Sequence, residues 1–386
     1  AAEMAKVITT EIGAPVSFAK RAQVGLPAMM MRAFLDLATH YEWHEIRRGY
    51  FGADVRVDRE PVGVVAAVVP WNMPQFLTIT KLIPALLAGC AVIIKPAPET
   101  SLDALLLAEI LAASDLPSGL VSVLPGDAAA GQHLVAHPGV DKVSFTGSTA
   151  VGRSVAAACA QNLTKVSLEL GGKSAAIVLD DADPAAVATG IRSASLSNSG
   201  QICNALTRIL VPESRKATFI DALADQLESI VLGDPADPGT QMGPLVSRRQ
   251  QLRVREYIAS GCHEGARLVV GGDGLPPGID RGWYVRPTLF ADATNDMRIA
   301  REEIFGPVLT VLTFRTPDEA LAKAKGNVTL SPQMMEGFAG AKVLVEALRR
   351  AGPKPTRERI LTALGGMGQY DLGGLELGYG PGDRTG

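Results

Sequence analysis

The chain has 386 residues, with 37 Lys and Arg against 40 Asp and Glu, so its formal net charge is −3. Domains usually run to roughly 100–200 residues, and this length therefore predicts two domains, or three. The composition excludes a wholly disordered chain, a collagen and a disulfide mini-protein. The nearly balanced charge argues against a nucleic-acid partner held by bulk electrostatics. The 40 glycines predict many tight turns or close backbone–ligand approaches.

Four cysteines stand at positions 90, 159, 203 and 262, and no two of them form a CxxC pair. This spacing disfavours a metal site and a disulfide framework, and it favours a reducing compartment. No apolar run of about 18 residues predicts a membrane span, and residues 1–6 show no signal-peptide pattern. We therefore expect a cytoplasmic protein without a membrane or nucleic-acid partner.

From residue 62 onward, strand patterns alternate with helical ones. The predicted strands of the first half are 62–69, 91–95, 120–124, 142–145 and 166–170. The helical patterns between them are 75–88, 101–113, 128–136 and 148–160. Repeated alternation of this kind predicts an α/β fold with a mostly parallel, doubly wound sheet.

The pattern continues in the second half. Strands are predicted at 174–179, 207–211, 284–289 and 308–314. Helices are predicted at 184–196, 214–230 and 247–260, with Gly- and Pro-rich loops at 233–244 and 271–282. After these, two further helices at 334–350 and 355–364 lead to a Gly-rich end.

Two side chains are candidates for chemistry. Cys203 follows a predicted helix in a loop of small residues, where a substrate can approach it; the alternative is a buried structural thiol. Glu169 stands between two leucines at the end of a predicted buried strand. Burial would raise the pKa of its carboxyl group and suit a general base; the alternative is an ion pair with Lys173.

Three further candidates follow other strands. In residues 145–152 a strand runs into a glycine and a helix that begins at Ser148, which is either a phosphate site or a plain N-cap turn. Asn72 is held between two prolines and either donates to an oxyanion or closes a turn. Lys95 ends the second strand and either reaches a ribose or is a solvated lysine. Because ligands bind at the carboxyl ends of strands in open α/β sheets, we expect Cys203 and these groups to meet there and to support covalent catalysis.

The ordered set of motifs resembles the aldehyde dehydrogenase superfamily. It consists of Pro70-Trp71-Asn72, Lys95-Pro96, the 145–152 turn, Leu168-Glu169-Leu170-Gly171-Gly172, Gly200-Gln201-Ile202-Cys203 and Glu302-Glu303-Ile304-Phe305-Gly306-Pro307. The resemblance covers residues 1 to about 326, and it implies oxidation of a small-molecule aldehyde to a carboxylic acid with NAD or NADP.

The resemblance also implies roles for individual residues. Cys203 would attack the aldehyde, Asn72 would hold the oxyanion, Glu169 would activate water, and Lys81 matches a lysine near the catalytic centre. The implied cofactor-binding residues are Trp71, Lys95, Gly147, Ser148, Gly152, Leu170, Glu303 and Phe305. No metal is implied.

Three departures from the family pattern bear on these expectations. Pro98 stands where NAD-preferring members often carry an acid, and Glu99 follows it, so the choice between NAD and NADP is open. The N-terminal helices of the family are mostly missing before residue 1. The family pattern also stops after residue 325, without the strand through which members form homo-oligomers.

Residues 327–386 instead resemble the C-terminal part of a branched-chain amino-acid ABC transporter substrate-binding protein. The resemblance rests on 331–338 and on Tyr370-Asp371-Leu372-Gly373-Gly374-Leu375. We therefore expect a cofactor domain at 1–170 with a possible oligomerisation arm at 43–61, a truncated catalytic domain at 171–326, and a foreign helical tail. The alternative to an active enzyme is an inactive chimera that keeps the motifs without a complete catalytic domain.

Overall fold

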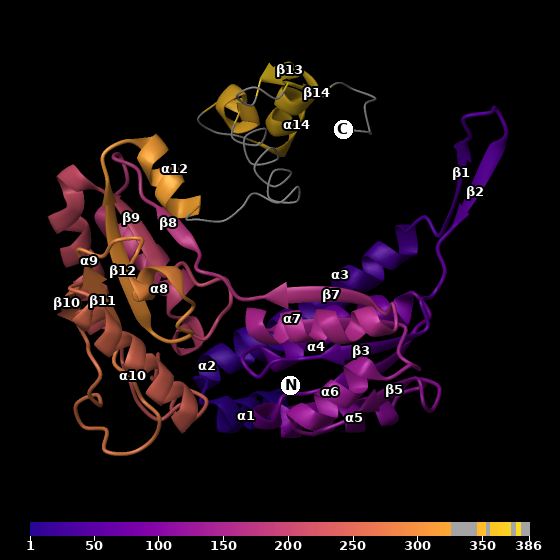
Figure 1. Ribbon diagram of the computed structural model, residues 1–386, viewed down its shortest axis with the longest axis horizontal. Coiled ribbons are helices and arrows are strands. Elements are labelled where there is room, and N and C mark those ends of the chain that lie inside the picture. The colour runs from indigo at the N-terminus through magenta and orange to yellow at the C-terminus, as the bar shows by residue number, and fades with distance from the viewer. Residues whose placement is uncertain (326–345, 353–355, 372–375, 380–386) are drawn as a thin grey trace. The chain divides into compact units, whose positions relative to one another are not determined.

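The computed structural model describes residues 1–325, 346–352, 356–371 and 376–379. The chain divides into two compact units, Ala1–Ala324 and Lys325–Gly386. Two separate five-stranded sheets form the framework of the first unit (Figure 1). In the second unit, α14 (Arg357–Gly365) is followed by an antiparallel hairpin of β13 (Gly368–Asp371) and β14 (Glu376–Tyr379). None of the described helices is long and apolar enough to cross a membrane.

The first unit begins with helices, although the sequence pattern predicted no helix or strand before residue 62. They are α1 (Ala2–Ile12), α2 (Val16–Phe18), the π-helical η1 (Ala19–Gly25) and α3 (Leu26–His40). Met4, Ile8 and Ile12 recur every four residues, so they share one face of α1 and are buried in the core beneath the first sheet.

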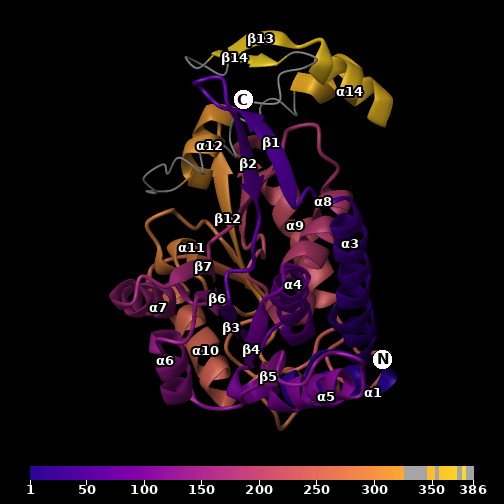
Figure 2. The ribbon, with the colours of Figure 1, turned by 90° about the vertical axis from the view of Figure 1, so that its right-hand side faces the viewer.

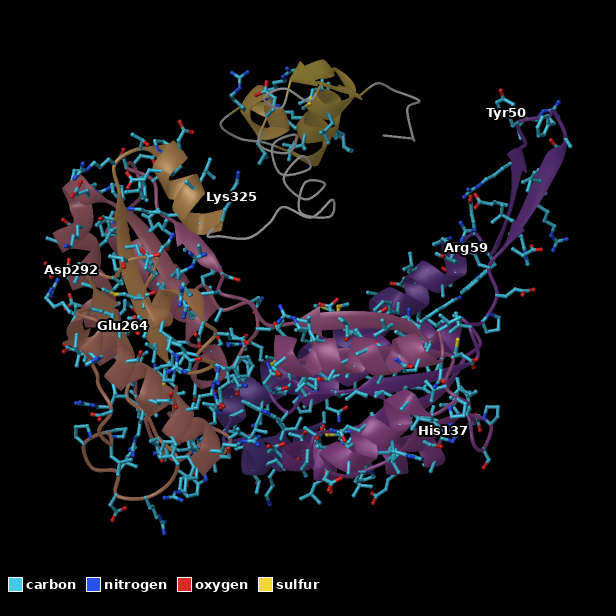
Figure 3. All side chains as sticks on the ribbon, viewed as in Figure 1. Tyr50, Arg59, His137, Glu264, Asp292 and Lys325 are labelled. Carbon is cyan, nitrogen blue, oxygen red and sulfur yellow. The ribbon has the colours of Figure 1, made fainter. Side chains whose placement is uncertain are left out.

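A two-stranded hairpin follows these helices. Strands β1 (His44–Arg48) and β2 (Asp54–Asp58) pair antiparallel, with His44 opposite Asp58. At its tip Tyr50 is 98% exposed and Phe51 95% exposed, and Arg59 follows at its base (Figure 3). The hairpin occupies the segment 43–61, whose function as an oligomerisation arm stays a prediction.

The first sheet is parallel throughout, in the order β5-β4-β3-β6-β7. Its strands are β3 (Val64–Val68), β4 (Ala91–Lys95), β5 (Val121–Val123), β6 (Lys142–Gly147) and β7 (Lys165–Leu170). The connecting helices are α4 (Pro74–Leu87), η2 (Pro98–Thr100), α5 (Ser101–Ala112), α6 (Ala128–Ala136) and α7 (Thr149–Gln161). All five predicted strands are present, within a few residues of their predicted ends.

Helices cover both faces of this sheet (Figure 2). Val65 and Ala67 of β3 belong to a core shared with α1, α4 and α5. Ala66, which points to the opposite face, belongs to a second core with α6 and α7. A strand buried on both faces has a continuous apolar sequence, as residues 62–69 do. The predicted doubly wound α/β fold is therefore confirmed.

The second sheet has the order β10-β11-β12-β9-β8, with only the β10–β11 pair antiparallel. Its strands are β8 (Ala175–Ile177), β9 (Arg208–Pro212), β10 (Arg267–Val270), β11 (Thr288–Ala291) and β12 (Val308–Phe314). Its helices are α8 (Pro184–Ser195), η3 (Ser197–Gly200), η4 (Glu213–Arg215), α9 (Lys216–Glu228), α10 (Arg248–His263), α11 (Arg298–Arg301) and α12 (Pro317–Lys325).

Two sequence expectations differ from the structure here. The strand predicted at 284–289 begins only at Thr288, because Pro287 has no N–H to contribute to a ladder. The short edge strand β10 was not predicted. The predicted helix at 334–350 lies mostly outside the described residues.

Candidate active site

A cavity of about 1140 Å³ lies in the first unit, at the carboxyl end of the first sheet. Ten of the twelve predicted site residues line it: Trp71, Asn72, Lys81, Gly147, Ser148, Glu169, Leu170, Cys203, Glu303 and Phe305. The other two lie behind the wall. Lys95 is buried, and Gly152 is buried on α7, where a Cβ atom would come within 2.5 Å of the Leu170 side chain. The fold thus gathers residues that are up to 234 positions apart in the chain, from Trp71 to Phe305 (305 − 71).

Cys203 lies in the turn between η3 and β9. The chain reaches it through three successive residues with positive φ, namely Asn198 at 52°, Ser199 at 57° and Gly200 at 75°. Only glycine fits at position 200, since a Cβ atom there would be 2.4 Å from the backbone of Gly306. As the sequence predicts, Cys203 follows a helical segment and precedes a strand, β9, so it reaches the cavity from the second sheet.

The Cys203 side chain is exposed, so the alternative of a buried structural thiol is wrong. Partial desolvation raises the pKa of this thiol above its ordinary value, and the negative charges of Glu303 and Glu169 raise it further. A thiolate is the reactive form of cysteine. The wall as it stands therefore keeps Cys203 largely protonated at neutral pH.

Asn72 is buried in the cavity wall and is tied to the loop that carries Cys203. Its Nδ2 donates to the Gln201 carbonyl at 2.9 Å, which leaves the second Nδ2 proton for a ligand. Its backbone carbonyl accepts from Asn198 Nδ2 at 2.9 Å and from Gln23 Nε2 at 2.8 Å. Residues distant in the chain therefore hold Asn72: the Gln201 carbonyl holds its side-chain amide, and Asn198 and Gln23 hold its backbone carbonyl.

Glu169 is exposed at the cavity, and the predicted burial of this carboxylate is wrong. It lies on β7, which is an edge strand, so one side of the strand has no neighbour to cover it. The alternative ion pair with Lys173 is absent from the described residues, since Lys173 Nζ is buried without a hydrogen-bond partner there.

Lys81 stands on α4 and is buried in the wall. Its Nζ lies 3.1 Å from Ser144 Oγ of β6. Burial lowers the pKa of Lys81 from 10.5 to about 8, against the opposing attraction of Glu169. Near neutral pH the Lys81 side chain can release a proton from its ammonium form or accept one in its amine form at the cavity wall.

The turn at the end of β6 has the form expected of a phosphate site. Ser148 caps α7, its Oγ accepting from Val151 N at 3.4 Å, and Gly147 and Ser148 at this helix start line the cavity. Lys95 is not a solvated lysine: its Nζ donates to the carbonyls of Pro96 at 2.7 Å and Gly126 at 2.6 Å. One of its three ammonium protons remains for a ligand.

The residues at the other end of the cavity fit a ligand that carries hydroxyl groups. The carboxylate of Glu303 lies directly against Gly171, where a Cβ atom would be 2.0 Å from Glu303 Oε2. Glu303 Oε1 and Thr146 Oγ1 are buried without a hydrogen-bond partner in the described chain. Phe305 packs edge-on against Trp71, with ring centroids 5.3 Å apart, and has a φ of 62°. A bulky residue in this conformation costs about 1–3 kcal/mol and is typical of functional sites.

Several residues of the site were not predicted. Gln250 and Arg253 of α10 line the cavity, and Gln23 and Asn198 hold Asn72 from behind. Gln250 and Arg253 could have been proposed from the sequence only as polar residues of the helix predicted at 247–260. No local pattern marks Gln23 or Asn198, because their partner lies 49 and 126 positions away.

Replacing Glu303 by glutamine is expected to speed the alkylation of Cys203 by iodoacetamide at pH 8, by roughly two- to tenfold. Loss of the negative charge lowers the thiol pKa and so raises the thiolate fraction. Mass spectrometry of the modified peptide measures the rate, in a Cys262→Ser background because Cys262 is also exposed. A rate that is unchanged or lower would show that Glu303 does not act on the thiol through its charge.

Comparison with known proteins identifies the family of this chain. The aldehyde dehydrogenase family matches residues 1–328. Geranial dehydrogenase of Castellaniella defragrans is 46% identical over 319 residues, which is 83% of this chain and 66% of that protein. A Staphylococcus aureus protein described as an aldehyde dehydrogenase is 41% identical over 320 residues, again 83% of this chain and 66% of the relative.

Solved structures are similar as well. An aldehyde dehydrogenase of Mycobacterium tuberculosis complexed with NAD+ has a TM-score of 0.81 and 45% identity, covering 83% of this chain and 66% of that one. A mutant aldehyde dehydrogenase C of Pseudomonas syringae, complexed with NAD+ and octanal, has a TM-score of 0.82 and 40% identity, covering 84% and 66%. The chain thus spans 66% of the length of the relatives compared here. The match over residues 1–328, more than half of the sequence, shows that the chain belongs to the aldehyde dehydrogenase family.

Proposed function

We propose that the protein oxidises an aldehyde to a carboxylic acid with NAD or NADP as the oxidant. One observation carries the proposal: the exposed Cys203 thiol shares a cavity with the Asn72 amide, the Glu169 carboxylate and the helix turn at Ser148. A nucleophile, an amide donor, a base and an anion-binding helix end are the groups that covalent aldehyde oxidation requires.

In this reaction the Cys203 thiolate adds to the aldehyde carbon and forms a thiohemiacetal. The free Nδ2 proton of Asn72 and the backbone N–H of Cys203 stabilise the oxyanion. A bound nicotinamide would supply the two-electron oxidation, as the acceptor of the hydride from the aldehyde carbon. Glu169 then takes a proton from a water molecule that attacks the resulting thioester, and the C–S bond breaks to release the acid and the thiolate.

The cofactor would be held by residues of both sheets. Ser148 and Gly147 would face its diphosphate together with the N-terminus of α7, and the remaining proton of Lys95 would be available to a ribose hydroxyl. Glu303 Oε1, which is buried and unpaired in the described chain, would accept from a hydroxyl of the second ribose, and Phe305 would lie beside the nicotinamide ring. Trp71 and Leu170 would complete the same wall, and Gly152 behind it leaves room for the Leu170 side chain.

The substrate is expected to be apolar. Phe76 and Leu77 of α4 line the cavity, and Thr80 and Lys81 are the polar residues that this helix contributes to the wall. One relative is named for geranial, and the structure of another contains octanal. Both compounds are hydrocarbon chains that end in an aldehyde group.

The test is an assay for aldehyde-dependent reduction of NAD and of NADP, with octanal and geranial as substrates. We expect turnover in the wild type and none above background in Cys203→Ala, which should keep its cofactor affinity. A folded, cofactor-bound wild type without turnover would reject the activity. It would favour the alternative, an inactive chimera that retains the motifs.

The resemblance of residues 327–386 to a substrate-binding protein stays a proposal about the origin of this segment. The family match ends at residue 328, which supports a junction near this point. Residues 331–338 of that resemblance lie outside the described residues, whereas Tyr370 and Asp371 belong to β13.

A further inference from the structure

Four consecutive residues, Glu302 to Phe305, bring a strained segment to the cavity. Glu303 and Phe305 line the wall, and Phe305 has a φ of 62°, which L-residues other than glycine rarely adopt. Such a conformation persists only where the surrounding contacts over-determine it. Side chains of two helices, α10 and α11, hold this segment.

The polar side chains of α10 hold the backbone of this segment. Gln250 and Arg253 stand three positions apart and therefore share a helix face. Gln250 Nε2 donates to the carbonyls of Phe305 at 2.8 Å and Ile304 at 3.3 Å. Arg253 Nη2 donates to the Glu303 carbonyl at 2.7 Å. Both residues line the cavity themselves.

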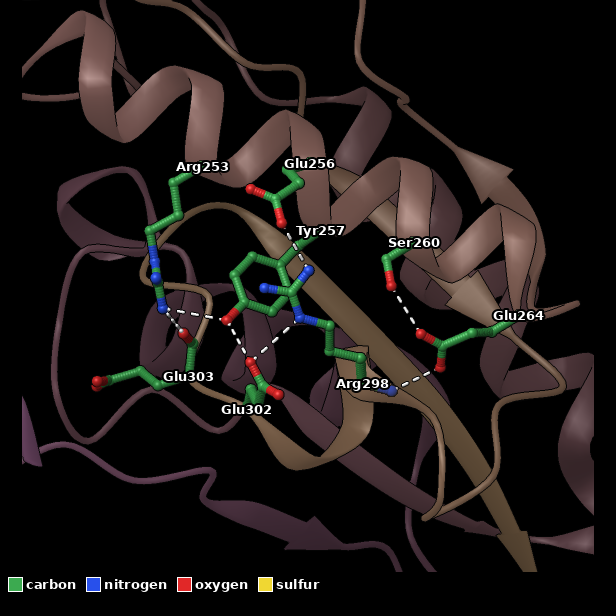
Figure 4. Close-up of polar contacts among 8 residues, drawn as sticks. All are labelled: Arg253, Glu256, Tyr257, Ser260, Glu264, Arg298, Glu302 and Glu303. Atoms are coloured by element: carbon green, nitrogen blue, oxygen red, sulfur yellow. Dashed lines mark hydrogen bonds and ion pairs between the residues drawn. The ribbon is translucent and has the colours of Figure 1, made fainter. Parts of the chain in front are cut away.

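Tyr257, one turn further along the same face, holds the start of the segment from outside the cavity. Its ring is buried, and its hydroxyl donates to Glu302 Oε2 at 2.6 Å (Figure 4). The same hydroxyl accepts from Arg253 Nη2 at 3.2 Å, so it joins the anchor of Glu302 to the anchor of Glu303.

Arg298 of α11 completes the network from the other side. Its guanidinium lies 4.2 Å from the centroid of the Tyr257 ring. Its Nε donates to Glu302 Oε2 at 3.2 Å and its Nη1 donates to Glu256 Oε1 at 2.7 Å. Figure 4 shows the chain of contacts from Glu256 through Arg298, Glu302 and Tyr257 to Arg253. Arg298 and Tyr257 therefore act on the same carboxylate oxygen.

We propose that Tyr257 and Arg298 are positioning residues for cofactor binding, which hold Glu302 so that Glu303 and Phe305 keep their places in the cavity. The inference rests on the proposed function, because it takes the cavity to bind a nicotinamide nucleotide. Neither side chain lines the cavity, so both act through the segment that they anchor.

The decisive variant is Tyr257→Phe, which removes one hydroxyl and leaves the packed ring. Binding of NADH, followed by its fluorescence, is expected to weaken about tenfold, as for the loss of a hydrogen bond to a charged group. The KM for the aldehyde should stay within about twofold, because the contacts of Asn72 and Cys203 do not change. The matched control is Tyr284→Phe. The Tyr284 side chain is also buried, and its hydroxyl donates to the Gly233 carbonyl at 2.8 Å, but Tyr284 neither lines the cavity nor anchors a segment that does.

A merely structural role gives a different result. In that case both variants would lower the melting temperature alike, and neither would change the NADH dissociation constant; this outcome overturns the proposal. If Tyr257→Phe does not fold, Glu302→Gln tests the same contacts at a half-exposed side chain, with several-fold weaker NADH binding expected. A wild type that binds neither NADH nor NADPH would reject the proposed function instead. The two failures are thus distinguishable.

Discussion

Glu169→Gln is expected to separate the two halves of the reaction. Steady-state turnover should fall by roughly 10²–10⁴-fold, the usual contribution of a general base. The first turnover should still produce one equivalent of reduced nicotinamide, because Cys203 and Asn72 are unchanged. Stopped-flow absorbance measures this burst, and mass spectrometry of the quenched enzyme detects the acyl group on Cys203.

The neighbouring lysine requires a control in this experiment. Glu169 raises the pKa of Lys81, so its removal shifts that pKa below about 8. At pH 9 Lys81 is largely neutral in both proteins, and a defect that persists there belongs to Glu169 itself. If the variant shows neither the burst nor the acyl adduct, Glu169 is required at or before hydride transfer. That result would contradict its assignment as the hydrolytic base.

Lys173→Met is expected to stabilise the folded protein at pH 6 by about 2–5 kcal/mol. Lys173 Nζ is buried without a hydrogen-bond partner in the described chain. Desolvation lowers the pKa of Lys173 from 10.5 to about 7, repulsion by Arg208 adds to this, and Glu303 and Glu302 oppose it. Methionine fills a similar volume and has no charge to desolvate.

The gain should depend on pH in a defined direction. Between pH 7 and 10.5 the unfolded lysine keeps its proton while the folded one has lost it, so the wild type gains stability as the pH rises. The advantage of Lys173→Met is therefore largest below pH 7 and disappears toward pH 10. Urea unfolding at pH 6, 8 and 10 measures it, and Lys6→Met, at an exposed lysine of α1, is the control with no expected trend. A loss of stability at pH 6 would mean that the buried ammonium group contributes a favourable contact.

The strands and helices of the two sheets followed closely from local pattern. Residues 91–95 and 308–314 are strands with the predicted ends, because each is a short β-branched run bounded by turn signals. The N-terminal helices did not follow from pattern. One of them is a π-helix that buries the polar Gln23 beside Ala19, and Gln23 donates a hydrogen bond to the Asn72 carbonyl.

The order of elements and the kinds of reactive groups can be read from local pattern, since periodicity and residue chemistry are local properties. The environment of each reactive group depends on contacts that form in the folded chain. Glu169 is exposed because β7 is an edge strand of the sheet. Lys95 can be buried because its ammonium group is satisfied by carbonyls such as that of Gly126, 2.6 Å from its Nζ. The strained Phe305 and its anchors on α10 depend on contacts between segments some 50 residues apart. No local pattern encodes such contacts, because they form only when the whole chain has packed.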